Sequence, residues 1–281
     1  MIDLHTHSTF SDGSLTPEQL VREAERARLS ALALTDHDTL DGLARFQASC
    51  ARSIVRGVPG VEISVDCSGG DATMHILGYF VDPENPDLNA HVQRLSEGRR
   101  RRNEEILKRL NAMGLALTMS EVASFAGEQN VGRLHFALAL VARGYVRANQ
   151  EAFDKYLGKG KSGYVNRVRF KPADGVAMIR RAGGIAVLAH PFTLNLGPGA
   201  LAEAVQALAE GGLQGIEVYY PQHPPKLVRQ YLELASRFGL VATGGTDFHG
   251  QPMPDVKLGR GFGSLDVPDE VLDQLNALRA C

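Results

Sequence analysis

The sequence has no tryptophan, only three cysteines and no long apolar run. Cys50, Cys67 and Cys281 are scattered and odd in number, which argues against a disulfide framework and fits a reducing compartment. None lies in Cys-x-x-Cys spacing, so we expect no cysteine metal site. No run approaches the roughly 18 apolar residues of a membrane helix, and the first residues do not form a basic and apolar leader. We therefore expect a cytoplasmic protein without a membrane span.

Charges of the two signs nearly cancel, with 30 lysine and arginine residues against 32 acidic ones and a net charge of −2. Long-range attraction of nucleic acid to the whole molecule is therefore not expected, and any anion site must be local. We predict no stable nucleic-acid partner, and the sequence carries no indication of an oligomeric state. The length of 281 residues suits one large α/β domain, or such a domain with an insertion.

Short apolar runs alternate with helical patterns over most of the chain. Runs at 31–35, 185–189, 215–219 and 240–243 predict buried strands, and each leads through a polar loop to a helical pattern. This alternation predicts parallel βαβ units, and in barrels of such units the chemistry collects at the carboxyl ends of the strands.

The middle of the chain breaks this rhythm. A helical pattern covers 85–113 and includes four consecutive arginines, 99–102, which we interpret mainly as a solvated helix face. Thr118 and Glu121 have the spacing of a capping box, and further helical patterns cover 132–143 and 151–157. We predict a barrel formed by 1–98 and 166–281, with a helical insertion, 99–165, that caps the active site.

Histidines and carboxylates gather at the predicted strands and their ends. Alternate residues of a strand share a face, so His5 and His7 project side by side. Burying many such groups without partners would cost several kcal/mol, and divalent cations supply the partners. Mixed imidazole and carboxylate ligation suits manganese, with zinc, iron or magnesium as alternatives, and nine donors suit two or three ions. The predicted ligands are His5, His7, Asp12, His37, Glu62, His75, His190, Asp247 and His249.

The order of these motifs resembles the PHP family, named for polymerase and histidinol phosphatase. The resemblance rests on His5-Thr6-His7 with Asp12, Thr35-Asp36-His37, Gly60-Val61-Glu62-Ile63, His75, Ala189-His190-Pro191 and Gly245-Thr246-Asp247-Phe248-His249. It covers the chain outside the insertion and fills all nine ligand positions. It implies an α/β fold, a distorted (β/α)7 barrel, with a trinuclear metal centre.

The resemblance also implies which residues share an ion. One ion would be held by His5, His7, Glu62 and Asp247, a second by Glu62, His75 and His190, and a third by Asp12, His37 and His249. Bound cations of this kind generate hydroxide near neutral pH and offset charge during in-line displacement at phosphorus. We expect a hydroxide between the first two ions to attack. Asp247 would be essential as a ligand, and His249, His190 or a bound water would assist the leaving oxygen.

Within the family, the segment Gly132-Arg133-Leu134-His135-Phe136-Ala137 and the insertion are similar to a branch of nucleoside 3′,5′-bisphosphate phosphatases. Some members of this branch also degrade short RNA as 5′→3′ exoribonucleases. The likeness implies hydrolysis of the 3′-phosphate to give a 5′-nucleotide. Arg133 and His135 are the candidates for binding the second phosphate, because arginine offers bidentate phosphate geometry. Weaker candidates are Arg99, Arg102, Lys159 and Lys161.

Other polar residues near these motifs are interpreted as structural or surface residues. Asp36, Asp38 and Asp41 are interpreted as acids at the start of a helix rather than as partners of ligands, and His91 and His223 as surface residues.

Four alternatives remain open from the sequence. A histidinol-phosphatase-like phosphomonoesterase is possible, although the insertion and the basic region near Arg133 favour a larger, more anionic substrate. A proofreading exonuclease of a DNA polymerase is disfavoured by the length of the chain. The other two are a metal-dependent amidohydrolase on a related barrel and a non-catalytic metal-binding module, since fold does not fix function.

Overall fold

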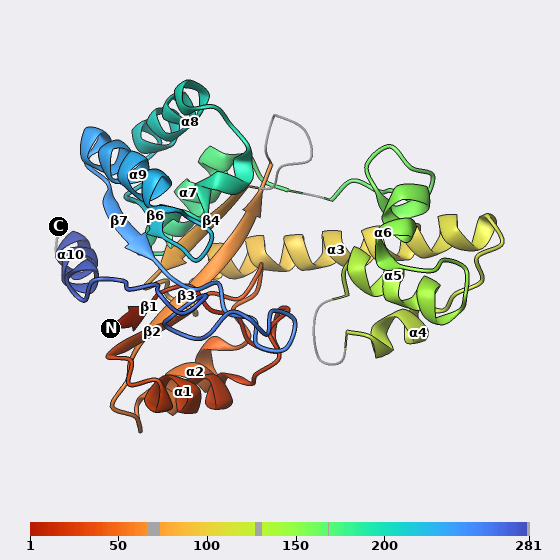
Figure 1. Cartoon of the computed structure of the whole chain (residues 1–281), viewed down its shortest axis with the longest axis horizontal. Helices are drawn as coiled ribbons and strands as arrows, with labels where there is room; N and C mark the ends of the chain where they lie inside the picture. The colour runs from red at the N-terminus through yellow and green to blue at the C-terminus, as the bar shows by residue number, and fades with distance from the viewer. Residues whose placement is uncertain (67–73, 127–130, 168, 280–281) are drawn as a thin grey trace. The chain divides into compact units, whose positions relative to one another are not determined.

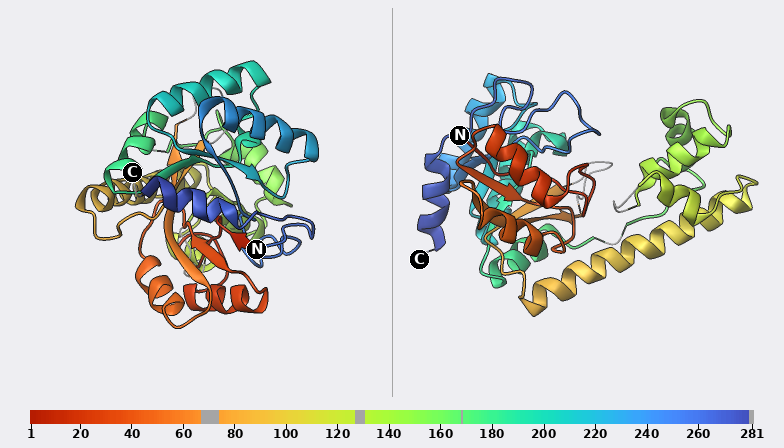
Figure 2. Two further views of the ribbon diagram at one scale, coloured as in Figure 1. Left: turned by 90° about the vertical axis from the view of Figure 1, so that its left-hand side faces the viewer. Right: turned by 90° about the horizontal axis from the view of Figure 1, so that it is seen from below.

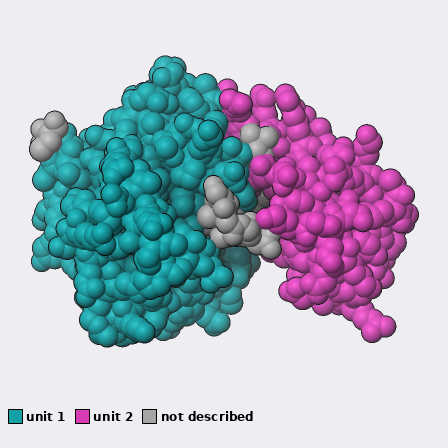
Figure 3. Space-filling view, turned by 90° about the horizontal axis from the view of Figure 1, so that it is seen from above, with its two compact units in different colours: residues 1–92, 169–281 teal, residues 93–168 magenta. Residues whose placement is uncertain are grey.

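The computed structural model describes residues 1–66, 74–126, 131–167 and 169–279 (Figure 1). Cys67 and Cys281 lie outside these residues. The chain forms two compact units, one of residues 1–92 and 169–281 and the other of residues 93–168, coloured separately in Figure 3. Each unit is described by itself, and the role of the insertion as a cap stays a prediction.

Seven strands form one sheet in the first unit, and they lie in the sheet in chain order. They are β1 (Ile2–Asp3), β2 (Ala31–Leu34), β3 (Arg56–Val65), β4 (Met74–Tyr79), β5 (Ile185–Leu188), β6 (Gly215–Tyr219) and β7 (Val241–Gly244). β1 to β3 are parallel, as are β5 to β7, but β4 runs antiparallel to both of its neighbours. The expectation of purely parallel units is therefore wrong at β4. Only residues 66–73 join β3 to β4, fewer than the dozen or so that a parallel crossover needs.

Backbone hydrogen bonds bring the first and last strands of the curled sheet together. Leu4 N donates to Gly244 O at 3.3 Å, and beyond the strands His7 N donates to Phe248 O at 2.9 Å. Phe248 N in turn donates to His5 O at 3.3 Å. The result is a distorted seven-stranded barrel of the expected α/β class, in which segments more than 200 residues apart in the sequence become neighbours.

α-Helices of the first unit surround this sheet (Figures 1 and 2). They are α1 (Pro17–Arg26), α2 (Leu43–Cys50), α7 (Pro172–Arg181), α8 (Pro198–Glu210), α9 (Pro225–Phe238) and α10 (Glu270–Arg279), with a 3-10 turn, η2 (Pro191–Leu194), after β5. Leu272 and Leu275 of α10 pack into the apolar interior with Ile2, Leu4 and Val187. Apolar side chains thus fill the barrel, and the polar ones collect beyond the carboxyl ends of most of its strands.

The second unit is helical and has its own apolar core. It contains most of α3 (Pro86–Ala112), with α4 (Met119–Ser124), α5 (Arg133–Ala142), α6 (Asn149–Ala152) and a π-helical turn, η1 (Phe153–Leu157). Ile106, Val122 and Phe136 are fully buried in this core. The predicted capping box is confirmed, because Glu121 N donates to Thr118 Oγ1 at 3.2 Å and Thr118 N donates to Glu121 Oε2 at 2.7 Å. Among the described residues, none of the helices combines the length and apolar character needed to cross a bilayer.

Gly245, directly after β7, lies tightly against His5, which follows β1. A Cβ atom at this position would overlap the backbone nitrogen and the Cβ of His5. We predict that Gly245→Ala lowers the free energy of unfolding by about 1–3 kcal/mol, measured by chemical denaturation, because the packed backbone cannot give way cheaply. Gly199→Ala, in α8 with open space around it, is the control and should leave stability equal or slightly higher. Equal stability of the two variants would contradict the tight approach.

Candidate metal centre

The structure brings all nine predicted ligands together in the first unit. His5 and His7 follow β1, His37 follows β2, His190 follows β5, and Asp247 and His249 follow β7. Glu62 and His75 lie within the antiparallel pair β3 and β4, and Asp12 lies in the loop after His7. Three overlapping groups of donor atoms result, namely His5, His7, Glu62 and Asp247; His37, Glu62 and His75; and His7, Asp12, His37 and His249.

The first group has the spacing of ligands around one ion. His5 Nε2 lies 3.3 Å from Glu62 Oε2 and 3.3 Å from Asp247 Oδ1. His7 Nε2 lies 3.3 Å and 3.0 Å from the same two oxygens. Ligands that are each about 2.0–2.2 Å from a shared zinc-sized ion lie about 3.0–3.4 Å apart. These four atoms therefore fit one divalent cation, and the set equals the first one implied by the family resemblance.

The other two groups share members with the first. Glu62 Oε1 lies 2.8 Å from His75 Nδ1 and 3.0 Å from His190 Nε2, which agrees with the implied second set. His37 faces two carboxylates, because its Nδ1 lies 2.9 Å from Glu62 and its Nε2 lies 3.7 Å from Asp12. The resemblance places His37 with the third ion alone, whereas the structure places it between the second and third groups.

Several buried atoms of this cluster make no hydrogen bond. They are His5 Nε2, His7 Nε2, Asp12 Oδ1, His37 Nδ1 and Glu62 Oε2. Each buried polar atom without a partner costs about 1–3 kcal/mol. Lone pairs of neutral imidazoles and carboxylates are also the donors that divalent transition-metal ions bind. The residues thus fit a group of bound cations better than they fit one another.

Burial and mutual charge shift the pKa values within the cluster. Burial alone would raise the pKa of Glu62, but the facing imidazoles, that of His37 foremost, hold it well below its usual range. Burial alone would lower the pKa of His7, but the carboxylates of Asp247 and Glu62 outweigh it and raise that pKa to about 10. Burial lowers the pKa of His75 to about 4. The carboxylates are therefore ionised at neutral pH, and a cation that binds His7 displaces its proton.

Glu217 of β6 is a functional residue that the sequence analysis missed. Its side chain is fully buried, and Oε1 accepts a hydrogen bond from His5 Nδ1 at 3.0 Å while Oε2 accepts one from His190 N at 2.7 Å. A carboxylate bound to Nδ1 fixes the imidazole tautomer and leaves Nε2 to face the metal. The feature of the sequence that could have identified Glu217 is its position as a charged residue in the middle of a short apolar strand.

Two aspartates beside His37 hold neighbouring segments that carry predicted ligands. Asp36 is buried and accepts hydrogen bonds from Ser8 N at 2.7 Å and from Ser11 Oγ at 2.6 Å. Asp38 is buried and accepts one from Ser64 N at 2.8 Å. Their interpretation as acids of a helix start is wrong, because α2 begins only at Leu43 and the two carboxylates accept hydrogen bonds from the loop after β1 and from β3.

The backbone is strained at two of the predicted ligands. His190 and Asp247 have φ angles of 25° and 53°, in the region that glycine favours. Such conformations cost of order 1–3 kcal/mol and persist where the surroundings fix them. Glu217 accepts from the nitrogen of His190, and buried Asp3 accepts from Thr246 N at 2.9 Å, just before Asp247. These hydrogen bonds hold the backbone at or beside both residues in its strained conformation.

An aromatic cluster lies behind Asp247. The Tyr220 hydroxyl donates to Asp247 Oδ2 at 2.9 Å and leaves Oδ1 to face the histidines. His223 packs at 5.1 Å between ring centroids from Tyr220, and its Nδ1 donates to Val218 O at 2.8 Å. His223 is only 7% exposed, so its interpretation as a surface residue is wrong. The loop after β6 folds back over the strand end, which its proline-rich sequence did not indicate.

The residues expected to bind the second phosphate lie in the second unit. The Arg133 guanidinium lies 5.4 Å from the Tyr164 ring centroid and donates to Leu157 O at 3.3 Å. His135 is buried, and its Nδ1 accepts from Gly132 N at 3.0 Å at the start of α5. Lys161 is exposed. Arg102 is only 8% exposed, so the solvated-face interpretation is wrong for this member of the arginine run. The phosphate contacts of these residues stay predictions.

Comparison with known proteins identifies the family. Residues 3–162 match the family model of the PHP domain. The chain belongs to the PHP family. It is 39% identical over 252 residues to the 3′,5′-nucleoside bisphosphate phosphatase of Chromobacterium violaceum, which covers 88% of this chain and 87% of that protein. It is 36% identical over 260 residues to the 5′-3′ exoribonuclease Rnm of Escherichia coli, which covers 92% and 88%.

A solved structure agrees with this assignment. An amidohydrolase from Chromobacterium violaceum, solved with bound sulfate and without metal, superposes with a TM-score of 0.83 at 36% identity, covering 98% of this chain and 96% of that one. Fold and family thus agree with the sequence motifs. This PHP protein is a metal-dependent phosphoesterase, that is, a hydrolase of phosphate esters.

The contacts of Glu217 predict its effect on metal binding. We predict that Glu217→Gln lowers the affinity for manganese about 10- to 100-fold, because one amide cannot accept from both His5 Nδ1 and His190 N. Competition with a chelating dye measures the affinity, and thermal denaturation checks the fold. Glu203→Gln, which removes the same charge from the exposed side of α8, is the matched control. Unchanged affinity in Glu217→Gln would rule out this orienting role.

Proposed function

We propose that this PHP protein removes the 3′-phosphate of nucleoside 3′,5′-bisphosphates to give 5′-nucleotides, and that it degrades short RNA from the 5′ end. The observation that carries the proposal is the cluster of predicted ligands around Glu62, in which five buried atoms lack hydrogen-bond partners. The names of the two relatives supply the substrate class. A bisphosphate also matches the strongly basic composition of residues 93–168.

We propose two or three divalent ions, manganese first among the candidates, as the cofactor of this site. Bound there, such ions lower the pKa of a bound water and neutralise charge on the phosphoryl oxygens. Ligand roles for His5, His7, Glu62 and Asp247 rest on the distances of 3.0–3.3 Å between imidazole nitrogens and carboxylate oxygens. Zinc and iron suit the same ligands.

His190 and His249 are the proposed candidates for assisting the leaving oxygen. His249 Nδ1 donates to Asp247 O at 2.7 Å, and its Nε2 lies 3.1 Å from Asp12 Oδ1. His190 Nδ1 bonds Thr193 Oγ1 at 3.0 Å, and its Nε2 points to Glu62. Because Nδ1 is engaged in both, Nε2 is the atom that each residue presents to the centre, as a ligand or as a proton carrier.

Phosphate release from adenosine 3′,5′-bisphosphate in the presence of manganese is the first test. We expect turnover that a chelator abolishes, and a loss of about 100-fold or more in His7→Ala and Asp247→Asn, because each removes a metal ligand from a buried group. Metal content is measured on the same samples, and Glu203→Gln again serves as the control. A variant that kept full metal content and full rate would overturn the ligand assignment. Faster hydrolysis of histidinol phosphate than of the bisphosphate would favour the histidinol-phosphatase alternative.

Arg133 provides the test of the second phosphate. We predict that Arg133→Ala lowers kcat/KM for the bisphosphate about tenfold or more while a nucleoside monophosphate ester is little affected, because a bidentate contact to phosphate is lost. The guanidinium also packs over Phe153 and Tyr164, so thermal denaturation must accompany the kinetics. Arg133→Lys keeps the positive charge but cannot make the bidentate contact. Its kcat/KM for the bisphosphate should therefore lie between those of the wild type and Arg133→Ala. Equal losses on both substrates would remove Arg133 from substrate recognition.

A further inference from the structure

The near-zero net charge of the chain conceals two oppositely charged units. Residues 93–168 contain 14 lysine and arginine residues against 7 acidic ones, a net charge of +7. The remaining residues contain 16 against 25, a net charge of −9. A positive region of this size raises the local concentration of anions, whatever the net charge of the whole molecule.

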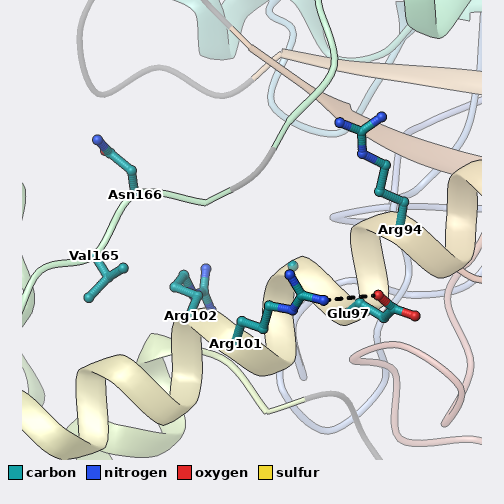
Figure 4. Close-up of a pocket in the computed structure, with 7 residues that line it drawn as sticks. Arg94, Glu97, Arg101, Arg102, Val165 and Asn166 are labelled. Atoms are coloured by element: carbon teal, nitrogen blue, oxygen red, sulfur yellow. Dashed lines mark ion pairs between the residues drawn. The ribbon is translucent and has the colours of Figure 1, made fainter.

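The second unit also contains a cavity of about 380 Å³ (Figure 4). Its lining comes from α3 and from the segment that returns toward the barrel, and comprises Arg94, Glu97, Gly98, Arg101, Arg102, Val165 and Asn166. Arg94, Gly98, Arg101 and Arg102 follow one another at helical spacing and form a single stripe along α3. A volume of this order suits a nucleotide-sized ligand rather than a single inorganic ion.

The charge in this cavity is positive and partly fixed in place. Three of its seven lining residues are arginines, and Glu97, its one carboxylate, lies 3.6 Å from Arg101. Arg102 is buried, and its Nη2 donates to Asn103 Oδ1 at 3.0 Å. Asn103 Nδ2 in turn donates to Val131 O at 2.8 Å, so the buried guanidinium has a defined position before any ligand binds. Guanidinium groups are suited to bidentate contacts with phosphate oxygens.

The length of the arginine stripe suits a ligand with several linked phosphate groups. Seven residues separate Arg94 from Arg101, which is about 10 Å along the axis of an α-helix and longer than one phosphate group. None of the seven lining residues is aromatic, so the site has no platform on which a base would stack. The arginines can contact the phosphate backbone of a nucleic acid chain, and the Asn166 amide can hydrogen-bond to a sugar or a base edge.

We infer that this cavity binds consecutive phosphodiester groups of a single-stranded oligoribonucleotide. The inference rests on the proposed function for its substrate class, and it adds a binding site to the metal centre. A nucleoside bisphosphate lacks the continuing chain that such a site would hold. RNA should therefore depend on these arginines and a bisphosphate should depend on them much less.

Direct binding tests the inference without requiring turnover. The probe is a short, fluorescently labelled oligoribonucleotide with phosphorothioate linkages that resist cleavage, titrated into the metal-loaded full chain. The variant Arg94→Ala/Arg101→Ala should weaken binding about tenfold or more and reduce the slope of log K against log salt by about 1.4, since single strands contribute about 0.7 per phosphate contact. The kcat/KM for short RNA should fall about tenfold more than that for the bisphosphate.

The matched control is Arg100→Ala/Lys108→Ala. It removes two positive charges from the same helix, but Arg100 pairs with Glu104, Lys108 is exposed, and neither residue lines the cavity. It should change the affinity for the probe less than about threefold. Glu97→Gln removes the one carboxylate of the cavity and should tighten binding, a gain that misfolding cannot produce.

Equal losses in the pocket and control variants would overturn the inference, because diffuse charge would then explain the binding. A wild-type protein that hydrolyses bisphosphates but does not bind the probe would overturn it and leave the proposed function standing. Pocket-dependent binding without bisphosphate hydrolysis would support the site and refute that part of the proposed function.

Discussion

One buried carboxylate, Glu62, needs opposite charge around it because its side chain is removed from water. Its side chain is fully buried, and imidazole nitrogens of His5, His7, His37 and His75 lie within 3.3 Å of its two oxygens. Moving a carboxylate out of water costs many kcal/mol unless opposite charge replaces the solvent. Protonated His5 and His7, whose pKa values the facing carboxylates raise despite burial, provide that charge in the absence of metal. Cations provide it without leaving buried nitrogens unbonded, which is why the nine donors are understood best as one site rather than as separate ion pairs.

The irregular features of the barrel follow from this demand. The first and last strands must meet for Asp247 to reach His5, and Gly245 allows that approach because it has no side chain. Further buried acids hold the histidines and loops by hydrogen bonds. Glu217 accepts one from His5 Nδ1, and Asp36 accepts one from Ser8 N. Strain at Asp247 is compatible with a stable fold because its neighbour Thr246 is fixed by two hydrogen bonds that it donates to buried Asp3.

The sequence predicted those parts of the site that short motifs encode. His5 and His7 could be found because alternate residues at the end of a strand share a face, and the ends of neighbouring strands must lie close together. Glu217 escaped because a single acid within a strand has no distinctive spacing and acts only through residues far away in the chain. His223 was misjudged because burial of a loop residue depends on tertiary packing. The direction of β4 was missed although the short link 66–73 already excluded a parallel crossover.

The opposite net charges of the two units keep apart two requirements that would conflict within one site. A hydrolase of phosphate esters needs negative ligands to hold cations and positive groups to hold an anionic substrate, and the two would neutralise one another if mixed. Here the excess of acids lies in the unit with the buried donors, and the excess of arginine and lysine lies in residues 93–168. Salt screens exposed charges over a Debye length of about 8 Å at physiological ionic strength but affects buried pairs much less. Metal retention and substrate capture would therefore respond differently to ionic strength, and selection could adjust one without loss of the other.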